Sequence, residues 1–143
     1  MPRNLLSRVK LVKVKDHSAA STADVTSSII DTAGYQGVVF FTSFGTADAT
    51  NSIKVQQNTA NQTTGMADLE GSSVASGTTD EDVIIEIAQP LERYLQVVAT
   101  RGASSTLESI WALLYGKEAQ ISGNSVAGTQ IAEVHVSPAE GTA

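Results

Sequence analysis

The stretch that most restricts the fold of this chain is residues 82–115, where three apolar runs follow one another closely. Residues 83–88 and 93–100 are rich in β-branched side chains, and a short segment containing Pro90 separates them. Runs of this kind, bounded by turn residues, are typical of β-strands. Pro90 has no N–H to donate to a strand ladder, so it belongs in the turn. We expect the two runs to form an antiparallel pair on which the rest of the chain packs.

The third run, residues 105–115, fits either a helix or a strand. In a helix, four large apolar side chains form one stripe: Leu107, Ile110, Trp111 and Leu114. A capping box of Ser105 with Glu108, and Gly116 at the C-terminal end, favour the helix. In a strand, another set shares one face: Leu107, Trp111, Leu113 and Tyr115. We take the strand, because the surrounding segments are β-like. We expect Trp111 and Tyr115 to pack in the core, with an exposed sugar-binding platform as the alternative.

Earlier segments predict further strands over residues 25–30, 35–42 and 52–57. Residues 38–41 are apolar at every position, which predicts a central strand covered on both faces. Ile53 and Val55 alternate with polar residues, so both should point into the core. Residues 66–71 fit a short strand or a turn, and the Ser-, Gly- and Thr-rich residues 72–80 predict a mobile loop.

Composition agrees with one all-β domain. The chain has 143 residues, which is enough for a single domain with a substantial core. It contains no cysteine, which excludes disulfides and thiolate metal sites. The first residues lack the apolar segment of a signal peptide, and no run approaches the roughly 20 apolar residues of a membrane helix. We therefore expect a soluble protein, made in the cytoplasm and without membrane contact.

The net charge of −6 is unevenly distributed. Five of the nine basic residues lie in the first 15 positions, which contain no acid: Arg3, Arg8, Lys10, Lys13 and Lys15. Residues 8–15 predict a strand, and the apolar positions change phase between Leu11 and Val12, which indicates a β-bulge. The basic side chains fit either a solvated strand face or a surface for an acidic partner. No aromatic residues interleave them, so we expect no direct contact with nucleic acid.

Residues 117–143 differ in composition from residues 1–116, and we expect an extended C-terminal arm after a β-sandwich domain. The arm is rich in Gly, Ser, Thr and Ala, and its apolar patch contains Ile131, Val134 and Val136. A segment this poor in apolar residues does not fold alone. It fits either a frayed tail or an arm that adds a strand to a neighbouring subunit.

Catalytic motifs are missing. The segment around Ser125 lacks the second glycine of a nucleophile elbow, and no other metal ligand lies at metal-binding spacing from His17 or His135. Three adjacent acids at residues 80–82 do not match a calcium-binding loop. A phosphate-binding loop with its Lys-Ser/Thr is absent. We expect no enzymatic activity, no cofactor, no metal and no small-molecule substrate.

Several short segments carry a resemblance to a known family. They are Asp-Thr-Ala-Gly-Tyr-Gln-Gly and the apolar residues after it at 31–40, and the segments at residues 53–57, 66–71, 90–95, 100–102, 114–116 and 136–142. In these segments the chain resembles small virion structural proteins of tailed bacteriophages, which are encoded near the major capsid gene. The likeness covers roughly residues 25–143 and leaves out the basic N-terminal strand. It implies a single antiparallel β-sandwich or jelly-roll-like barrel with extended terminal arms.

The resemblance further implies a capsid decoration, or cement, protein on the capsid surface of a virion. Its expected partners are the major capsid protein and copies of itself, as a homo-oligomer. The residues that we expect at these contacts come from the basic strand and the arm: Arg8, Lys10, Lys13, Lys15, Ile131, Val134 and Val136. A head–tail connector, a tail component and a carbohydrate-binding β-sandwich remain alternatives.

Overall fold

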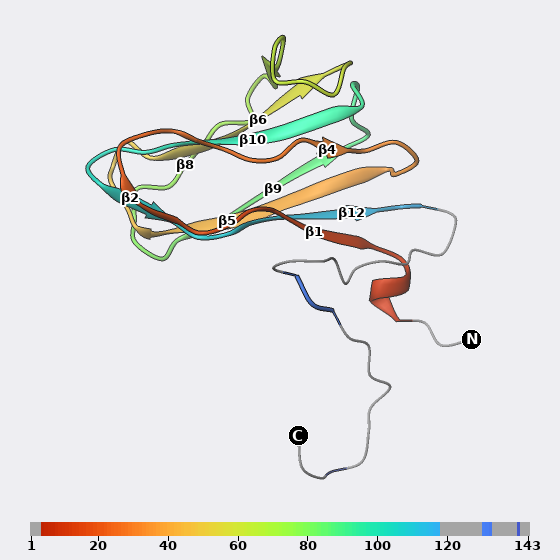
Figure 1. Ribbon diagram of the computed structural model, residues 1–143, viewed down its shortest axis with the longest axis horizontal. Helices are drawn as coiled ribbons and strands as arrows, with labels where there is room; N and C mark the ends of the chain where they lie inside the picture. Colours follow the sequence, from red (N-terminus) through yellow and green to blue (C-terminus); the bar gives the residue numbers. More distant parts are fainter. Residues whose placement is uncertain (1–3, 118–129, 133–139, 141–143) are drawn as a thin grey trace.

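The computed structural model describes residues 4–117, 130–132 and 140. These residues form two antiparallel sheets that stack face to face in a sandwich-like, half-barrel arrangement (Figure 1). A short 3₁₀ helix, η1 (Leu5–Ser7), precedes the first strand, and Asn4 caps it. The predicted all-β sandwich is confirmed. The predicted arm at residues 117–143 lies mostly outside the described residues.

The first sheet has strands from both ends of the described chain. Its order is β1 (Lys10–Lys15), β12 (Ile110–Tyr115), β5 (Gly37–Thr46), β11 (Ser105–Leu107) and β2 (Ser18–Ser21), and β9 (Asp82–Ala88) pairs with the other edge of β5. The register of β1 against β12 shifts between Lys13 and Lys15. The predicted bulge is therefore confirmed, slightly later in the strand than the phase change in the sequence.

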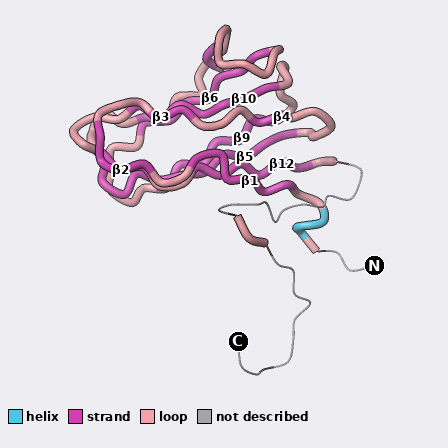
Figure 2. The backbone as a smooth tube through the Cα atoms, in the orientation of Figure 1, coloured by secondary structure: helices cyan, strands magenta, loops and turns pink. Residues whose placement is uncertain are grey.

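The second sheet lies across the core from the first (Figure 2). Its order is β3 (Val25–Thr26), β10 (Tyr94–Thr100), β6 (Ser52–Asn58) and β7 (Ala67–Asp68); β4 (Ile30–Asp31) also pairs with β10, and β8 (Val74–Ala75) pairs with β6. The predicted strand at residues 25–30 is thus split into β3 and β4. Between them, the Ser27 hydroxyl accepts the Val97 N–H at 2.9 Å. The predicted loop at residues 72–80 contains the short strand β8.

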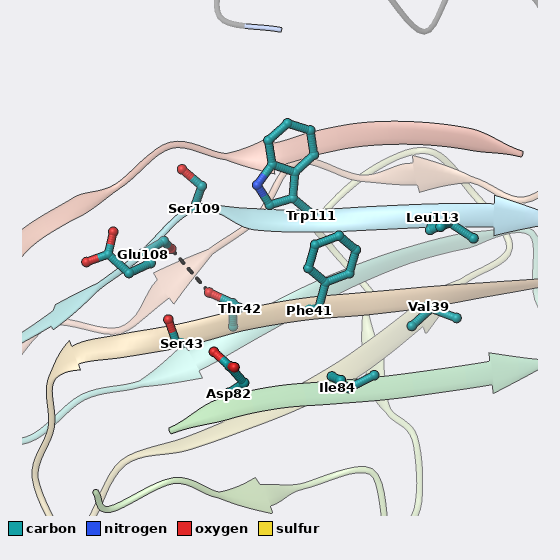
Figure 3. Close-up of a pocket in the computed structure, with 10 residues that line it drawn as sticks. All are labelled: Val39, Phe41, Thr42, Ser43, Asp82, Ile84, Glu108, Ser109, Trp111 and Leu113. Atoms are coloured by element: carbon teal, nitrogen blue, oxygen red, sulfur yellow. Dashed lines mark hydrogen bonds between the residues drawn. The ribbon is translucent and has the colours of Figure 1, made fainter. Parts of the chain in front are cut away.

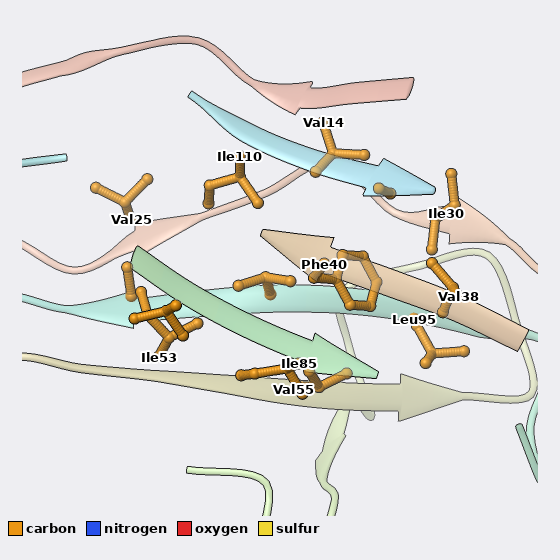
Figure 4. Packing of buried hydrophobic residues seen from close by; sticks show 14 of the residues in the cluster. Val14, Val25, Ile30, Val38, Phe40, Ile53, Val55, Ile85, Leu95 and Ile110 are labelled. Carbon is orange, nitrogen blue, oxygen red and sulfur yellow. The ribbon is translucent and has the colours of Figure 1, made fainter. Parts of the chain in front are cut away.

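Alternating side chains of both sheets meet in one core (Figure 4). Several strands contribute at least two side chains each to this core, including Val38, Phe40 and Phe44 of β5, Ile53 and Val55 of β6, Leu95, Val97 and Ala99 of β10, and Ile110, Ala112 and Leu114 of β12. Successive side chains of a strand point to opposite faces, so the residues next to each of these positions point outward. This alternation confirms the inward prediction for Ile53 and Val55.

The ambiguous segment at residues 105–115 forms two strands, β11 and β12, as the sequence interpretation favoured. The side chains that this segment points into the core are not the predicted ones. Leu107 is fully buried, but strand β11 ends at this residue. The next strand, β12, begins at Ile110, whose side chain points into the core. Trp111 and Tyr115 therefore lie on the outer face and are half-buried. Their predicted place in the core is wrong, because the core face of β12 is already taken by the alternate residues.

The predicted pairing of residues 83–88 with 93–100 is also wrong. Both segments are strands, but β9 pairs with β5 and β10 pairs with β6, in different sheets. Gln89 adopts a left-handed backbone conformation, with φ of 51°, where the chain leaves β9. The chain then crosses from one layer to the other. The apolar faces of the two strands consequently meet across the core instead of lying side by side.

The apolar strand at residues 38–41 is central, as predicted, since β5 has partners along both edges. The prediction that both of its faces are covered is wrong for the described residues. Val38 and Phe40 are buried, whereas Val39 and Phe41 are half-buried on the outer face of the sheet. In the described part of the chain, no second layer packs on the outer face of β5, so the outward apolar side chains of this strand stay partly exposed.

Candidate interaction surface

The outward side of strands β12, β5 and β9 carries a contiguous apolar surface. It consists of five side chains, which we call the apolar outer face: Val39, Phe41, Ile84, Trp111 and Leu113. They line an open groove of about 510 Å³ (Figure 3). Ile84 is 69% exposed within the described part of the chain. A large aliphatic side chain at that exposure, continuous with two partly exposed aromatic side chains, is the pattern of an interaction surface.

The strand register explains why these side chains lie together. Trp111 is paired with Phe41, and Phe41 is paired with Ile84. Lys13 of β1 is paired with Trp111, so the row continues to the edge of the sheet. Paired residues of neighbouring strands point to the same face, a few ångströms apart. The row therefore runs from a basic residue at one edge through two aromatic rings to Ile84 at the other.

Neighbours from both adjacent strands flank the Trp111 indole. The Phe41 ring stacks with it at 6.5 Å between centroids and 8° between planes, and Lys13 Nζ lies 5.8 Å from the indole centroid. Lys13 Nζ is also 3.0 Å from an Asp16 carboxylate oxygen. Because sugar-binding platforms present an open ring face, this flanking disfavours a carbohydrate site at Trp111.

Polar groups line one end of the groove, and several of them already have partners. The Thr42 hydroxyl donates to the Glu108 carbonyl at 3.2 Å (Figure 3). The Glu108 carboxylate lies 3.4 Å from His17 Nδ1. Asp82 and Ser109 complete this end. The groove thus has an apolar middle and a polar rim, as protein interfaces do.

Tyr115 closes the opposite end of the outer face. Its hydroxyl donates a hydrogen bond to the Glu86 carboxylate on β9, and this bond raises the pKa of Tyr115. Its ring lies over Gly37, where a Cβ atom would collide with it. The absence of a side chain at Gly37 is therefore what allows the tyrosine to reach across β5 to β9.

Gln130, a residue of the C-terminal segment, binds the outer edge of β1 through its side chain. The Gln130 side-chain oxygen accepts the Lys13 N–H at 3.1 Å, and its amide nitrogen donates to the Leu11 carbonyl. Gln130 is only 7% exposed. A side-chain amide offers one donor and one acceptor, so it satisfies edge groups of β1 much as a neighbouring strand would.

The structure brings part of the predicted contact set together. Arg8 and Lys15 are exposed near the two ends of β1, and Lys10 and Lys13 are half-buried in it. Ile131 follows the anchored Gln130 and is 85% exposed, so it lies near the same edge. Val134 and Val136 lie outside the described residues.

Sequence reasoning missed the apolar outer face. The signal was present in residues 38–41 and 83–85, which are apolar at consecutive positions. A strand that is apolar on both faces either packs against other elements on both sides or leaves one apolar face exposed to solvent. The choice between these depends on the number of layers, which only the fold supplies.

Comparisons with known proteins do not identify a family. No protein-family model matches this chain, and no curated protein matches it at a significant level.

Among the described residues, no group of three or more His, Asp or Glu side chains is placed to hold a metal ion. In the same part of the chain, no helix has the length and apolar character needed to cross a membrane.

Proposed function

We propose that this protein is a structural component of a tailed-bacteriophage virion, namely a decoration protein that stabilises the capsid through contacts between subunits. The observation that carries the assembly role is the apolar outer face, in which Ile84 is 69% exposed and lies beside Phe41. The phage assignment rests on the sequence resemblance. The two arguments are independent of each other.

The energetic argument for assembly is the cost of leaving these side chains in water. Burial stabilises by about 25 cal/mol per Å² of apolar surface, and aromatic side chains contribute the largest areas. A single small contact of this kind is weak. A capsid repeats the contact by symmetry many times, so that weak contacts together resist internal pressure.

The β1 edge supplies a second contact region in this proposal. Gln130 fixes the start of a C-terminal segment there, and Ile131 is exposed immediately after it. Exposed Arg8 and Lys15 lie at the ends of the same strand. This combination fits an acidic surface of the capsid protein, with Ile131 entering an apolar pocket and the basic residues at the rim.

A carbohydrate-binding module is the second candidate, because Trp111 is half-buried on the outer face and not in the core. The rings and charges beside the indole weigh against it. Isothermal titration with oligosaccharides distinguishes the two functions, since a binding module retains a sugar as a monomer. A connector or tail component would differ from a capsid decoration protein in its position in the virion.

The test is co-sedimentation of the purified protein with undecorated capsid shells. The wild type should sediment with shells and not with isolated tails. Ile84→Arg should lose most of this binding, because it places a charge on the apolar outer face. Leu91→Arg is the matched control, since Leu91 is 91% exposed on the turn between β9 and β10 and does not line the groove. Wild-type protein that stays in the supernatant with shells would overturn the proposal.

A further inference from the structure

Strand β9 has a partner along only one of its two edges in the described part of the chain, where it pairs with β5 alone. A groove of about 530 Å³ lies beside it. The walls of this groove are residues 84–88 of β9 and, from the connection between β7 and β8, residues 69–72 and Val74. Because the lining includes inward and outward residues of β9, the groove follows the edge of the strand and not one of its faces.

Two hydrogen bonds fix the direction of the backbone groups in β5. Phe44 O accepts the Asp80 N–H at 2.9 Å, and Gln36 O accepts the Gln89 N–H at 2.7 Å. Both carbonyls therefore point toward the β9 side of β5. Hydrogen-bonded and non-hydrogen-bonded pairs alternate along an antiparallel ladder. Every second residue of β5 between these two positions consequently turns its N–H and C=O toward β9.

The register then identifies the open groups of β9. The residues that pair with these β5 positions are Val83, Ile85 and Ile87. The residues between them, Ile84 and Glu86, direct their N–H and C=O away from β5, along the groove. An edge strand with such groups is a template for the addition of another strand.

The edge of the second sheet, across the groove, is covered by the chain itself. The Val55 N–H donates to the Ser72 hydroxyl at 3.1 Å, and Val55 O accepts the Leu69 N–H at 3.0 Å. The short strands β7 and β8 pair with β6 on either side of this point. Within the described residues, the backbone groups open to an added strand are therefore those of β9.

The side chains of the groove define what kind of strand fits. Leu69 and Ile87 are partly buried against the core, and Val74 is 39% exposed. Glu70 and Glu86 are exposed, and the lining contains no Lys, Arg or His. The groove thus combines apolar side chains with an acidic rim.

We propose that β9 binds an extended segment of another protein, in which Lys or Arg alternates with aliphatic residues, as an added strand. Strand addition takes its affinity from backbone hydrogen bonds and its specificity from alternate side chains. Residues opposite each other in neighbouring strands share a face. The partner residues opposite Ile85 and Ile87 would therefore be aliphatic, and the one opposite Glu86 would be basic.

Segments of this chain itself do not fit the groove as well. After Lys117 the sequence contains no Lys or Arg, whereas Glu118, Glu133 and Glu140 follow it. The basic strand β1 has the required alternation in part, but it is paired with β12 inside its own sheet. The charge of the groove therefore favours a different protein as the partner over a second copy.

The first test uses NMR of the isotope-labelled, full-length protein with the peptide Lys-Val-Lys-Val-Lys-Val-Lys, blocked at both ends. The amide signals of Ile84 and Glu86 should shift, and their hydrogen exchange should slow when the peptide binds. The same peptide with Glu at every Lys position should bind at least about tenfold more weakly. Unchanged Ile84 and Glu86 amides, or equal binding of the two peptides, would overturn the proposal.

A proline variant tests the backbone contact. Ile84→Pro removes an N–H that faces away from β5, and edge strands tolerate proline at such positions. Ile84→Ala is the matched control, because it shortens the side chain and keeps the N–H. The Lys peptide should bind Ile84→Pro about tenfold more weakly than Ile84→Ala, with circular dichroism showing that both are folded. Equal binding by the two folded variants would contradict strand addition.

A charge variant on the opposite wall decides the question if Ile84→Pro does not fold. Glu70→Lys should weaken binding of the Lys peptide about fivefold, as expected for an exposed charge pair. Unweakened binding would refute the acidic rim as the source of specificity. The inference goes beyond the proposed function, and the two fail separately. Protein that binds capsid shells and not the peptide would refute this inference alone, and the reverse would refute the proposed function alone.

Discussion

Asn51 shows how one buried polar side chain holds a turn in place. Its Oδ1 accepts the Gly102 N–H at 2.8 Å, and its Nδ2 donates to the Ser105 hydroxyl at 2.9 Å. The two residues between these partners, Ala103 and Ser104, have positive φ angles of 44° and 59°. Non-glycine residues adopt that region only when their surroundings enforce it. The Asn51 network provides this enforcement between β10 and β11.

Replacing Asn51 should be costly for stability. Asn51→Ala leaves buried donors and acceptors without partners, so we expect a loss of about 2–4 kcal/mol in the free energy of unfolding. Urea denaturation followed by circular dichroism measures it. Asn61→Ala, at an exposed loop position, should change stability by less than about 0.5 kcal/mol. Equal effects of the two variants would contradict the role of Asn51.

Asp31 and Arg93 form a bidentate ion pair on the second sheet. Arg93 Nε and Nη2 each donate to a carboxylate oxygen of Asp31 at 2.8 Å. The hydrogen bond from Arg93 is the largest cause that lowers the pKa of Asp31 below its usual 3.8. Both side chains are about half exposed, so solvent screens the pair and its contribution to stability is small.

The pH dependence of this pair has a definite sign. Because folding lowers the Asp31 pKa, the contribution is present above the unfolded pKa and is lost as the pH falls through the folded value. Wild type should therefore be more stable than Asp31→Asn at neutral pH, and the difference should shrink in acid. Urea unfolding at several pH values measures it. In an Arg93→Gln background this pH-dependent difference should become smaller but should not vanish, because the Ala33 N–H also donates to Asp31 and lowers its pKa. A difference between wild type and Asp31→Asn that is constant with pH would refute the assignment.

Among the described strands, β1 stands at one end of the order of the first sheet. An edge strand offers unpaired N–H and C=O groups. Gln130 satisfies two of these groups with its side chain, at Lys13 and Leu11. The C-terminal segment is thereby tied to the sheet by a residue that is more than 110 positions away in sequence.

Removing this tie should loosen the β1 edge without unfolding the sandwich. Gln130→Ala deletes the acceptor of the Lys13 N–H, so this amide should exchange with solvent about fivefold faster, as expected for the loss of about 1 kcal/mol. Hydrogen exchange monitored by NMR resolves the single amide. Gln62→Ala, in the exposed loop after β6, should leave it unchanged. Unaltered Lys13 exchange in Gln130→Ala would show that Gln130 does not protect the edge.

For the molecule as a whole, the core between the two sheets supplies the stability, and the outer face is the surface that we propose for contacts with partners. Both contain large apolar side chains, but only the first set is covered within the described chain. Leu95 is fully buried among residues of both sheets, whereas Leu91, four positions earlier, is 91% exposed.

This pair of leucines gives a matched test of the core. Leu95→Ala should lower the free energy of unfolding by about 2–5 kcal/mol, because it removes buried surface and leaves a cavity. Leu91→Ala should have little effect, since its side chain is already in water. Chemical denaturation of both variants measures the contrast. Similar losses in the two would contradict the arrangement of the layers.

The sequence alone predicted the all-β class, most of the strands, the bulge in β1 and the inward face of β6. It succeeded there because strand propensity and side-chain alternation are properties of neighbouring residues. The contact region at the basic strand and Ile131 stays a prediction, which was made from the charge of the first 15 residues and from an apolar patch in a polar segment.

Only the tertiary structure decided which strands pair and which apolar faces remain open. β9 and β10 are neighbours in sequence but belong to different sheets, because each buries its apolar face from the opposite side of the core. Trp111 and Phe41 are apolar in sequence, yet the core face of their strands is taken by alternate residues. Strand pairing and layer number depend on contacts between distant segments, and those contacts turned two predicted core aromatics into a surface.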